Sequence, residues 1–138
     1  MLTLARDSHL SSLGERLLAP GVLEGFFKGV TVTPSILHGD LWSGNISGLR
    51  NERGNARGGV TIFDPAVYYG HHEAEFGMSW CASFTSDFWT AYRRHVPKEA
   101  GFENRLRIYK LYHYLNHFVL FGSGYKQECV SILQYLLR

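Results

Sequence analysis

The spacing of apolar residues predicts that the second half of the chain is mainly helical. Beyond Gly70 we expect helices over residues 73–82, 86–95, 105–121 and 126–137. In the third of these segments, apolar side chains recur at steps of three and four residues, which is the period of one helix face. The members of this face are Leu106, Tyr109, Tyr112, Leu115 and Val119. Further apolar residues lie outside the face, so we expect this helix to be buried on most sides.

The first half of the chain shows shorter elements. The Ser-Leu-Gly-Glu sequence at residues 12–15 matches a capping box and predicts the start of a short helix, and a second helical piece is expected at 22–28. Apolar or β-branched runs predict strands at 35–37 and 60–63, which we expect to form one hairpin-like unit. The polar, glycine-rich residues 49–59 are expected to form an exposed loop. The predicted fold class is therefore mostly α with a small β-hairpin.

Composition narrows the classes of protein that remain. A length of 138 residues fits one domain, and an apolar share of 45% excludes disorder of the whole chain. The balance of 14 basic against 12 acidic side chains is too even to favour binding to nucleic acid or to a membrane surface.

The expected compartment is the cytoplasm. Cys81 and Cys129 are not spaced as a pair, so reduced thiols are the simplest interpretation. The sequence has neither an apolar run of transmembrane length nor the apolar core of a secretory signal. Organellar targeting stays open, because the N-terminal region carries arginine and serine residues, although Asp7 and Glu15 weaken that interpretation.

Residues 38–45, with the sequence His-Gly-Asp-Leu-Trp-Ser-Gly-Asn, fit the pattern H-x-D-L-x-x-x-N of a kinase catalytic loop. Phosphoryl transfer depends mostly on positioning and charge neutralisation. Asp40 is placed to accept or orient the proton of an attacking hydroxyl. Asn45 follows five residues later, where its amide oxygen can reach a Mg²⁺ ion on the phosphates of a nucleotide. A second acidic ligand is expected from Asp64, at the end of a predicted strand.

Other residues near these motifs have both structural and functional interpretations. His38 is expected to support the catalytic loop by packing and hydrogen bonding rather than to react. Trp42 either stacks on a sugar or wedges the loop against the helical body, and both alternatives remain open. His117 is a candidate for the substrate cleft, with a core position as the alternative.

Two sequences, Leu-His-Gly-Asp-Leu-Trp-Ser-Gly-Asn at 37–45 and Phe-Asp-Pro-Ala-Val-Tyr-Tyr-Gly-His at 63–71, resemble the fructosamine kinase (ketosamine-3-kinase) family. That family is similar in fold to aminoglycoside phosphotransferases and protein kinases. The resemblance implies ATP-dependent phosphorylation of the sugar O3 of ketosamines, as small molecules or on glycated proteins, which repairs the protein. It also implies that Asp40 is the catalytic base and that Asn45 and Asp64 hold Mg²⁺.

The start of the chain departs from this pattern. Before the catalytic loop the sequence contains neither a G-x-G-x-x-G loop nor a strand lysine of the V-A-I-K type. We therefore expect residues 1–33 to be a helical lead-in and residues 34–138 to be the C-terminal catalytic lobe of a protein-kinase-like fold, without the nucleotide lobe. An alternative is that the lobe alone has little turnover and acts as a binding module. Its apolar face toward the missing lobe would be exposed, and such surfaces bind partner proteins.

Two other classes of site are weaker alternatives. Zinc ligands are offered by the His-His-Glu-Ala-Glu sequence at 71–75 together with His113 and His117, but H-E-x-x-H is not matched. An arginine- and glycine-rich patch around Arg50, Arg53 and Arg57 suggests nucleic acid. It lacks interleaved aromatic residues, so a solvated loop is the preferred interpretation.

Overall fold

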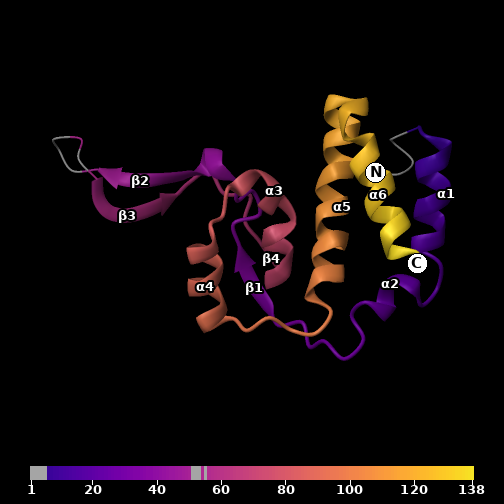
Figure 1. Ribbon diagram of the computed structural model, residues 1–138, viewed down its shortest axis with the longest axis horizontal. Helices are drawn as coiled ribbons and strands as arrows, with labels where there is room; N and C mark the ends of the chain where they lie inside the picture. Colours follow the sequence, from indigo (N-terminus) through magenta and orange to yellow (C-terminus); the bar gives the residue numbers. More distant parts are fainter. Residues whose placement is uncertain (1–5, 51–53, 55) are drawn as a thin grey trace. The chain divides into compact units, whose positions relative to one another are not determined.

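The structure is a computed structural model that describes residues 6–50, 54 and 56–138, with only the backbone described at Arg50, Ala56 and Arg57. Residues 1–5, which the targeting interpretation includes, and Arg53 of the arginine-rich patch lie outside the described residues. The chain divides into two compact units (Figure 1). Unit 1 combines the residues up to Thr31 with Glu99–Arg138, and unit 2 is Val32–Lys98.

Unit 1 is helical. Its elements are α1 (Ser8–Leu17), α2 (Val22–Gly25), α5 (Phe102–Phe121), the 3-10 turn η3 (Ser123–Tyr125) and α6 (Lys126–Leu136). Helices α5 and α6 run side by side, and α1 packs on α6 (Figure 1). The core consists of leucines at helical spacing with one isoleucine and one thiol: Leu10, Leu13, Leu17, Leu111, Leu115, Cys129, Ile132, Leu133 and Leu136.

Two helices of unit 1 begin earlier than the sequence predicts. Helix α1 begins at Ser8 because Asp7 caps it, with the Asp7 carboxylate accepting from the Leu10 amide at 3.0 Å. The capping box at 12–15 was therefore the wrong start. Helix α5 begins directly after Gly101, which has φ +79°, a conformation that suits glycine. The buried Arg105 closes this turn by donating to the Ala100 carbonyl at 2.7 Å.

The strands of unit 2 form two antiparallel pairs (Figure 1). Strand β1 (Pro34–Leu37) pairs with β4 (Tyr68–His71), and β2 (Ile46–Arg50) pairs with β3 (Ala56–Ile62). The prediction that 35–37 pairs with 60–63 is wrong. After residues 38–45 the chain forms strand β2, and β2 rather than β1 is the partner of β3. Among the described residues of the expected loop 49–59, Leu49 and Arg50 belong to β2, and residues 56–59 belong to β3. Backbone hydrogen bonds form the β2–β3 hairpin, so its exposed polar and glycine residues do not prevent it.

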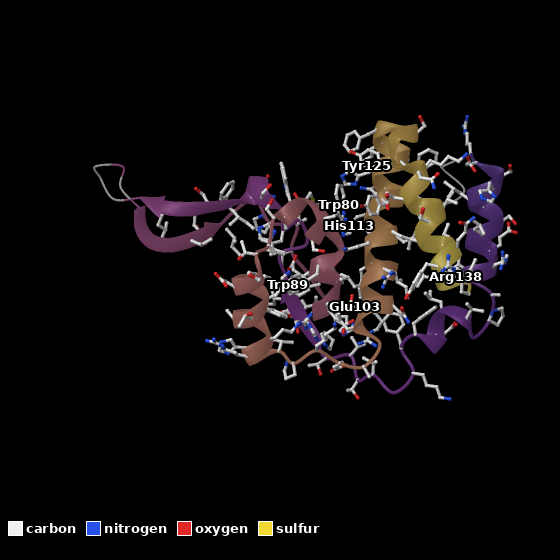
Figure 2. All side chains as sticks on the ribbon, viewed as in Figure 1. Trp80, Trp89, Glu103, His113, Tyr125 and Arg138 are labelled. Atoms are coloured by element: carbon white, nitrogen blue, oxygen red, sulfur yellow. The ribbon has the colours of Figure 1, made fainter. Side chains whose placement is uncertain are left out.

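The helices of unit 2 surround a cluster of aromatic rings. The 3-10 segment η2 (His72–Met78) leads into α3 (Ser79–Ala82), and α4 (Ser86–His95) follows after Thr85 caps it. The buried Phe76 ring contacts the ring of Trp89, labelled in Figure 2, with centroids 4.8 Å apart. The prediction of α4 is confirmed, whereas the predicted helix at 73–82 is mainly 3-10.

No helix in the described part of the chain combines the length and the apolar character that crossing a lipid bilayer requires.

Candidate active site

Residues 38–45 connect β1 to β2 and are tied to residues 63–66, which follow β3. The Ala66 amide donates to the His38 carbonyl at 2.8 Å, and the Phe63 amide donates to the Asn45 carbonyl at 3.1 Å. These bonds hold the two sequence motifs together at both ends of the loop. The last part of the loop is the 3-10 turn η1 (Ser43–Asn45).

The buried Asn45 side chain links the two predicted acidic positions. Its Nδ2 donates to the Asp40 carbonyl at 2.9 Å, to the Asp40 carboxylate at 3.0 Å and to the Asp64 carbonyl at 3.5 Å. All three partners are oxygens, so the orientation of the amide follows from the hydrogen bonds. The other edge of the amide presents Oδ1 as a ligand atom.

Asp64 has a backbone conformation that is unusual for a residue with a side chain. Its φ is +54°, in the left-handed region, and its side chain is exposed. This conformation aims the Asp64 carbonyl at Asn45, and strain of this kind clusters at functional sites.

His38 joins the loop to the residue before Asp64. Its Nε2 lies 2.9 Å from the Phe63 carbonyl, and its Nδ1 lies 3.4 Å from the Asp40 amide. A carbonyl only accepts and an amide only donates, so these partners select the neutral tautomer with the proton on Nε2.

Glu75, on η2, binds the backbone of the loop, a contact that the sequence analysis missed. Its carboxylate accepts from the backbone amides of His38 at 2.5 Å and Gly39 at 3.0 Å. In the sequence analysis, Glu75 belonged to a candidate zinc segment. The one sequence signal for a different role was an acidic side chain close to the two motifs. A carboxylate that accepts two backbone N–H bonds fixes the start of the loop.

Trp42 lies over its own loop, and His117 belongs to the other unit. A Cβ at Gly44 would approach the Trp42 ring to 2.3 Å, so glycine is needed for the indole to fold back, while Trp42 keeps 39% of its surface exposed. His117 lies on α5, where its Nδ1 donates to the His113 carbonyl at 2.8 Å and its ring contacts Tyr125. The structure brings His38, Asp40, Asn45 and Asp64 together within unit 2, and His117 lies in unit 1.

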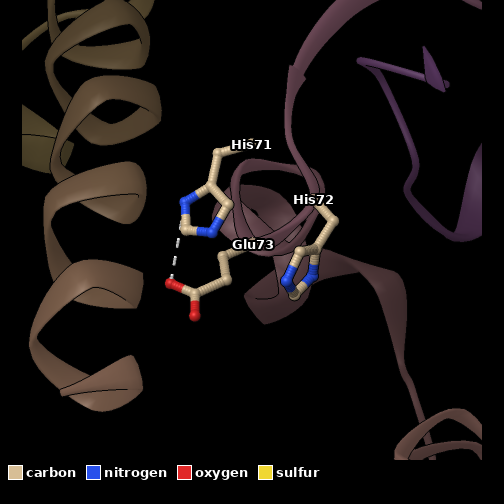
Figure 3. Close-up of side chains that lie close together, drawn as sticks. All are labelled: His71, His72 and Glu73. Atoms are coloured by element: carbon tan, nitrogen blue, oxygen red, sulfur yellow. Dashed lines mark ion pairs between the residues drawn. The ribbon is translucent and has the colours of Figure 1, made fainter. Parts of the chain in front are cut away.

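The candidate zinc residues of unit 2 form a cluster (Figure 3). Ligand atoms of His71, His72 and Glu73 lie within 4.8 Å of one another, and the buried Glu73 carboxylate lies 3.9 Å from His71 Nδ1. The His72 Nδ1 is engaged with the Tyr92 hydroxyl at 3.1 Å. Burial raises the pKa of Tyr92. The Arg93 guanidinium opposes this rise, and Glu73 and Glu75 add to it.

The donor set around Asn45 suits Mg²⁺ rather than a softer metal. Asp40, Asn45 and Asp64 offer carboxylate and amide oxygens, and Mg²⁺ prefers hard oxygen ligands and takes only a few from protein. The anchored Nδ2 of Asn45 leaves its oxygen for this purpose. The residues present therefore fit the ion that the motifs imply.

Comparisons with known proteins point to one family. A family model described as fructosamine kinase matches residues 1–138. A protein named protein-ribulosamine 3-kinase, chloroplastic, from Oryza sativa subsp. japonica is 50% identical over 132 residues, covering 96% of this chain and 36% of the relative. The ketosamine-3-kinase of Mus musculus is 42% identical over 113 residues, covering 81% and 34%. The chain thus spans about a third of the length of these relatives.

Solved structures show the same fold. A provisionally named fructosamine-3-kinase from Haemophilus somnus superimposes with a TM-score of 0.67 at 21% identity, covering 98% of this chain and 48% of that one. A second, from Thermobifida fusca, gives a TM-score of 0.64 at 27% identity and covers 94% and 47%. The predicted fold class, mostly α with a small β-hairpin, is confirmed.

Proposed function

Because the chain belongs to the fructosamine kinase family, we propose that it forms the catalytic part of an ATP-dependent kinase that phosphorylates ketosamines at the sugar O3. The observation that carries this proposal is the bond network in which one buried amide, Asn45, connects Asp40 and Asp64. The substrates are ketosamines on glycated proteins or on small amines, and phosphorylation begins the removal of the adduct.

Asp40 acts on the substrate hydroxyl in this proposal. Asn45 holds one oxygen of its carboxylate, Oδ2, and the Asp40 amide bonds to His38. The second oxygen is left to orient the sugar hydroxyl and to accept its proton as the oxygen attacks the terminal phosphorus. A positioned base of this kind contributes about 10²–10⁴-fold to rate.

Asn45 and Asp64 are the proposed Mg²⁺ ligands. When bound, the ion supplies charge neutralisation on the phosphates of ATP. The chain contributes the orientation of the Asn45 amide, which is fixed by three hydrogen bonds, one of them to the Asp64 carbonyl. His38 and Glu75 hold the loop in place, and Trp42 and His117 remain candidates for contacts with the sugar.

The test is release of ADP on a fructosyl-lysine peptide, measured for the complete gene product and for the 138-residue chain. We expect Asp40→Ala to lower turnover of the complete protein by at least about 10²-fold. Asp87→Asn is the matched control, because Asp87 is exposed in the first turn of α4. Full activity of the Asp40→Ala protein would contradict the proposal. We expect little turnover from the 138 residues alone.

A partner-binding role is a second candidate, favoured by exposed apolar side chains of unit 2. These are Ile36, Val60, Ile62, Phe63, Val67 and Tyr69, each at least 45% exposed. Large apolar side chains that are exposed and lie together are typical of surfaces that another protein covers. A complete protein with no ADP release, together with stable complex formation lost on substitution of Ile36 and Val60 by serine, would favour this role.

The proposed compartment is the cytoplasm, with an organelle as the alternative outcome, because the relatives from Oryza sativa and Arabidopsis thaliana carry chloroplastic names. A fluorescent fusion of the complete gene product separates the two.

A further inference from the structure

We propose that the cavity between α5 and α6 of unit 1 is a carbonyl-capture site, in which the amine of Lys110 adds the aldehyde of a short neutral aldose. The cavity has a volume of about 220 Å³. It lies within one compact unit and uses no residue of the catalytic loop, so the inference does not depend on the proposed kinase activity.

The cavity is built from one face of each helix. Glu103, Leu106, Lys110 and Tyr114 follow one another on α5 at steps of three and four residues, and α6 supplies Ile132. Leu106 and Ile132 are buried and form an apolar floor. Pockets for drug-sized ligands measure roughly 300–1,000 Å³, so this cavity suits a smaller molecule. Figure 2 labels Glu103 at the start of α5.

Lys110 is surrounded by groups that control its protonation. Burial lowers the pKa of Lys110, and the neighbouring Arg107 guanidinium lowers it further, while Glu103 opposes both. Arg107 is held by its bond to the Glu103 carbonyl at 3.0 Å and by the Tyr135 ring, whose centroid lies 4.1 Å from the guanidinium carbon. A lysine with a lowered pKa carries more neutral amine at a given pH, and the neutral amine is the nucleophile.

The reaction balances without an added oxidant or reductant. The neutral Nζ of Lys110 attacks the aldehyde carbon, a C–N bond forms, and the carbonyl oxygen leaves as water to give an imine. The adjacent carbon then loses a proton and the imine nitrogen gains one, which gives an enaminol. The former aldehyde carbon next gains a proton while the enol hydroxyl loses one, and the product is a ketosamine. Glu103 and Glu128 line the cavity and supply carboxylates for the proton transfers.

The charge of the lining selects the class of sugar. Glu103 and Glu128 balance Arg107 and Lys110 when the lysine is protonated, so the lining becomes negative once Lys110 is neutral. A neutral aldose is therefore preferred over a phosphorylated aldose.

The four lysines of the chain make the test specific. They are Lys28, Lys98, Lys110 and Lys126. The folded chain is incubated with D-ribose and dialysed to remove imines, and the remaining adduct is quantified at each lysine by mass spectrometry of chymotryptic peptides. We expect several-fold more adduct at Lys110 than at the exposed Lys28 and Lys98, and the preference should decrease in urea and at high pH.

Two variants and one second sugar complete the design. Glu128→Gln should slow formation of the dialysis-resistant adduct at Lys110, whereas Lys28→Arg should leave it unchanged. Adduct distributed among the lysines according to exposure alone would overturn the inference. A preference for ribose 5-phosphate over ribose at Lys110 would overturn the assignment of a neutral ligand.

Discussion

At the scale of single residues, close packing and hydrogen bonds of a few side chains constrain the conformation of the loop at 38–45. Gly39 has φ +79°, and a Cβ there would lie 2.3 Å from the Ala66 carbonyl oxygen. The Nδ2 group of Asn45 donates hydrogen bonds to oxygen atoms, and the Glu75 carboxylate accepts hydrogen bonds from the two backbone amides at the start of the loop. The motif names the residues of this loop, but contacts that shape its start come from Ala66 and Glu75, which lie more than 20 positions away.

Gly39→Ala should destabilise unit 2 through both backbone strain and a steric clash. Gly58→Ala is the matched control, since Gly58 has φ +69° but a Cβ there would meet nothing within 4 Å. The control should cost only the strain of left-handed backbone, about 1–2 kcal/mol, and Gly39→Ala should cost more. Urea unfolding followed by tryptophan fluorescence measures the difference, because Trp42, Trp80 and Trp89 all lie in unit 2. Equal losses would show that the close approach to Ala66 does not constrain the loop.

Glu75→Gln should lower stability by about 1–3 kcal/mol, because its amide group would face a backbone N–H donor. The same urea titration measures this loss. Asp87→Asn, which removes an exposed carboxylate of the same unit, should cost no more than about 1 kcal/mol. A Glu75→Gln protein as stable as the control would contradict the bridging role.

At the scale of elements, helical periodicity located the long helices but not the ends that tertiary contacts decide. Helix α4 agrees with its prediction at both ends, and α5 and α6 differ by a few residues. Helix α1 begins at Ser8 with Asp7 as its cap, and Lys126, distant in sequence, pairs with the capping carboxylate at 2.6 Å. The strand partners were predicted wrongly, since strand pairing depends on how the catalytic loop turns the chain.

The Asp7 cap makes the stability of unit 1 depend on pH. Lys126 and the Leu10 amide lower the pKa of Asp7 below its ordinary 3.8. A lowered pKa contributes stability that is present above 3.8 and is lost as the pH falls through the lowered value. Asp7→Asn keeps a capping oxygen but removes the charge, so it should reduce this loss on acidification. Thermal midpoints by far-UV circular dichroism at neutral and acidic pH test it, and an unchanged difference between the two pH values would refute it.

At the scale of the whole molecule, the chain builds two compact units, and the first is closed by segments from opposite ends of the sequence. The apolar face of α5 was visible as a pattern in the sequence, but no pattern says that α1 packs on α6. Each unit contains one cysteine, so thiol reactivity can be used to follow the unfolding of each unit separately. Cys129 lies fully buried in the core of unit 1, and Cys81 lies in unit 2.

Cys129 should stay unreactive until unit 1 opens. Burial raises the pKa of its thiol to about 11, so at pH 8 only roughly a thousandth is thiolate. In a Cys81→Ser protein, the rate of alkylation should rise with urea together with loss of helical circular dichroism rather than with the tryptophan signal. Rapid alkylation of the native protein would contradict the burial of Cys129.

The sequence alone determined what is local. It predicted α4, α5 and α6 to within a few residues, and it singled out His38, Asp40, Asn45 and Asp64 as candidate site residues from two short sequence motifs. Only the tertiary structure decided the strand partners, the hydrogen bonds of Glu75 to the loop and the cap of α1. These features depend on contacts between segments that are distant in the sequence. Packing and hydrogen bonding between such segments stabilise the fold, but they produce no periodic pattern in the sequence from which they could be predicted.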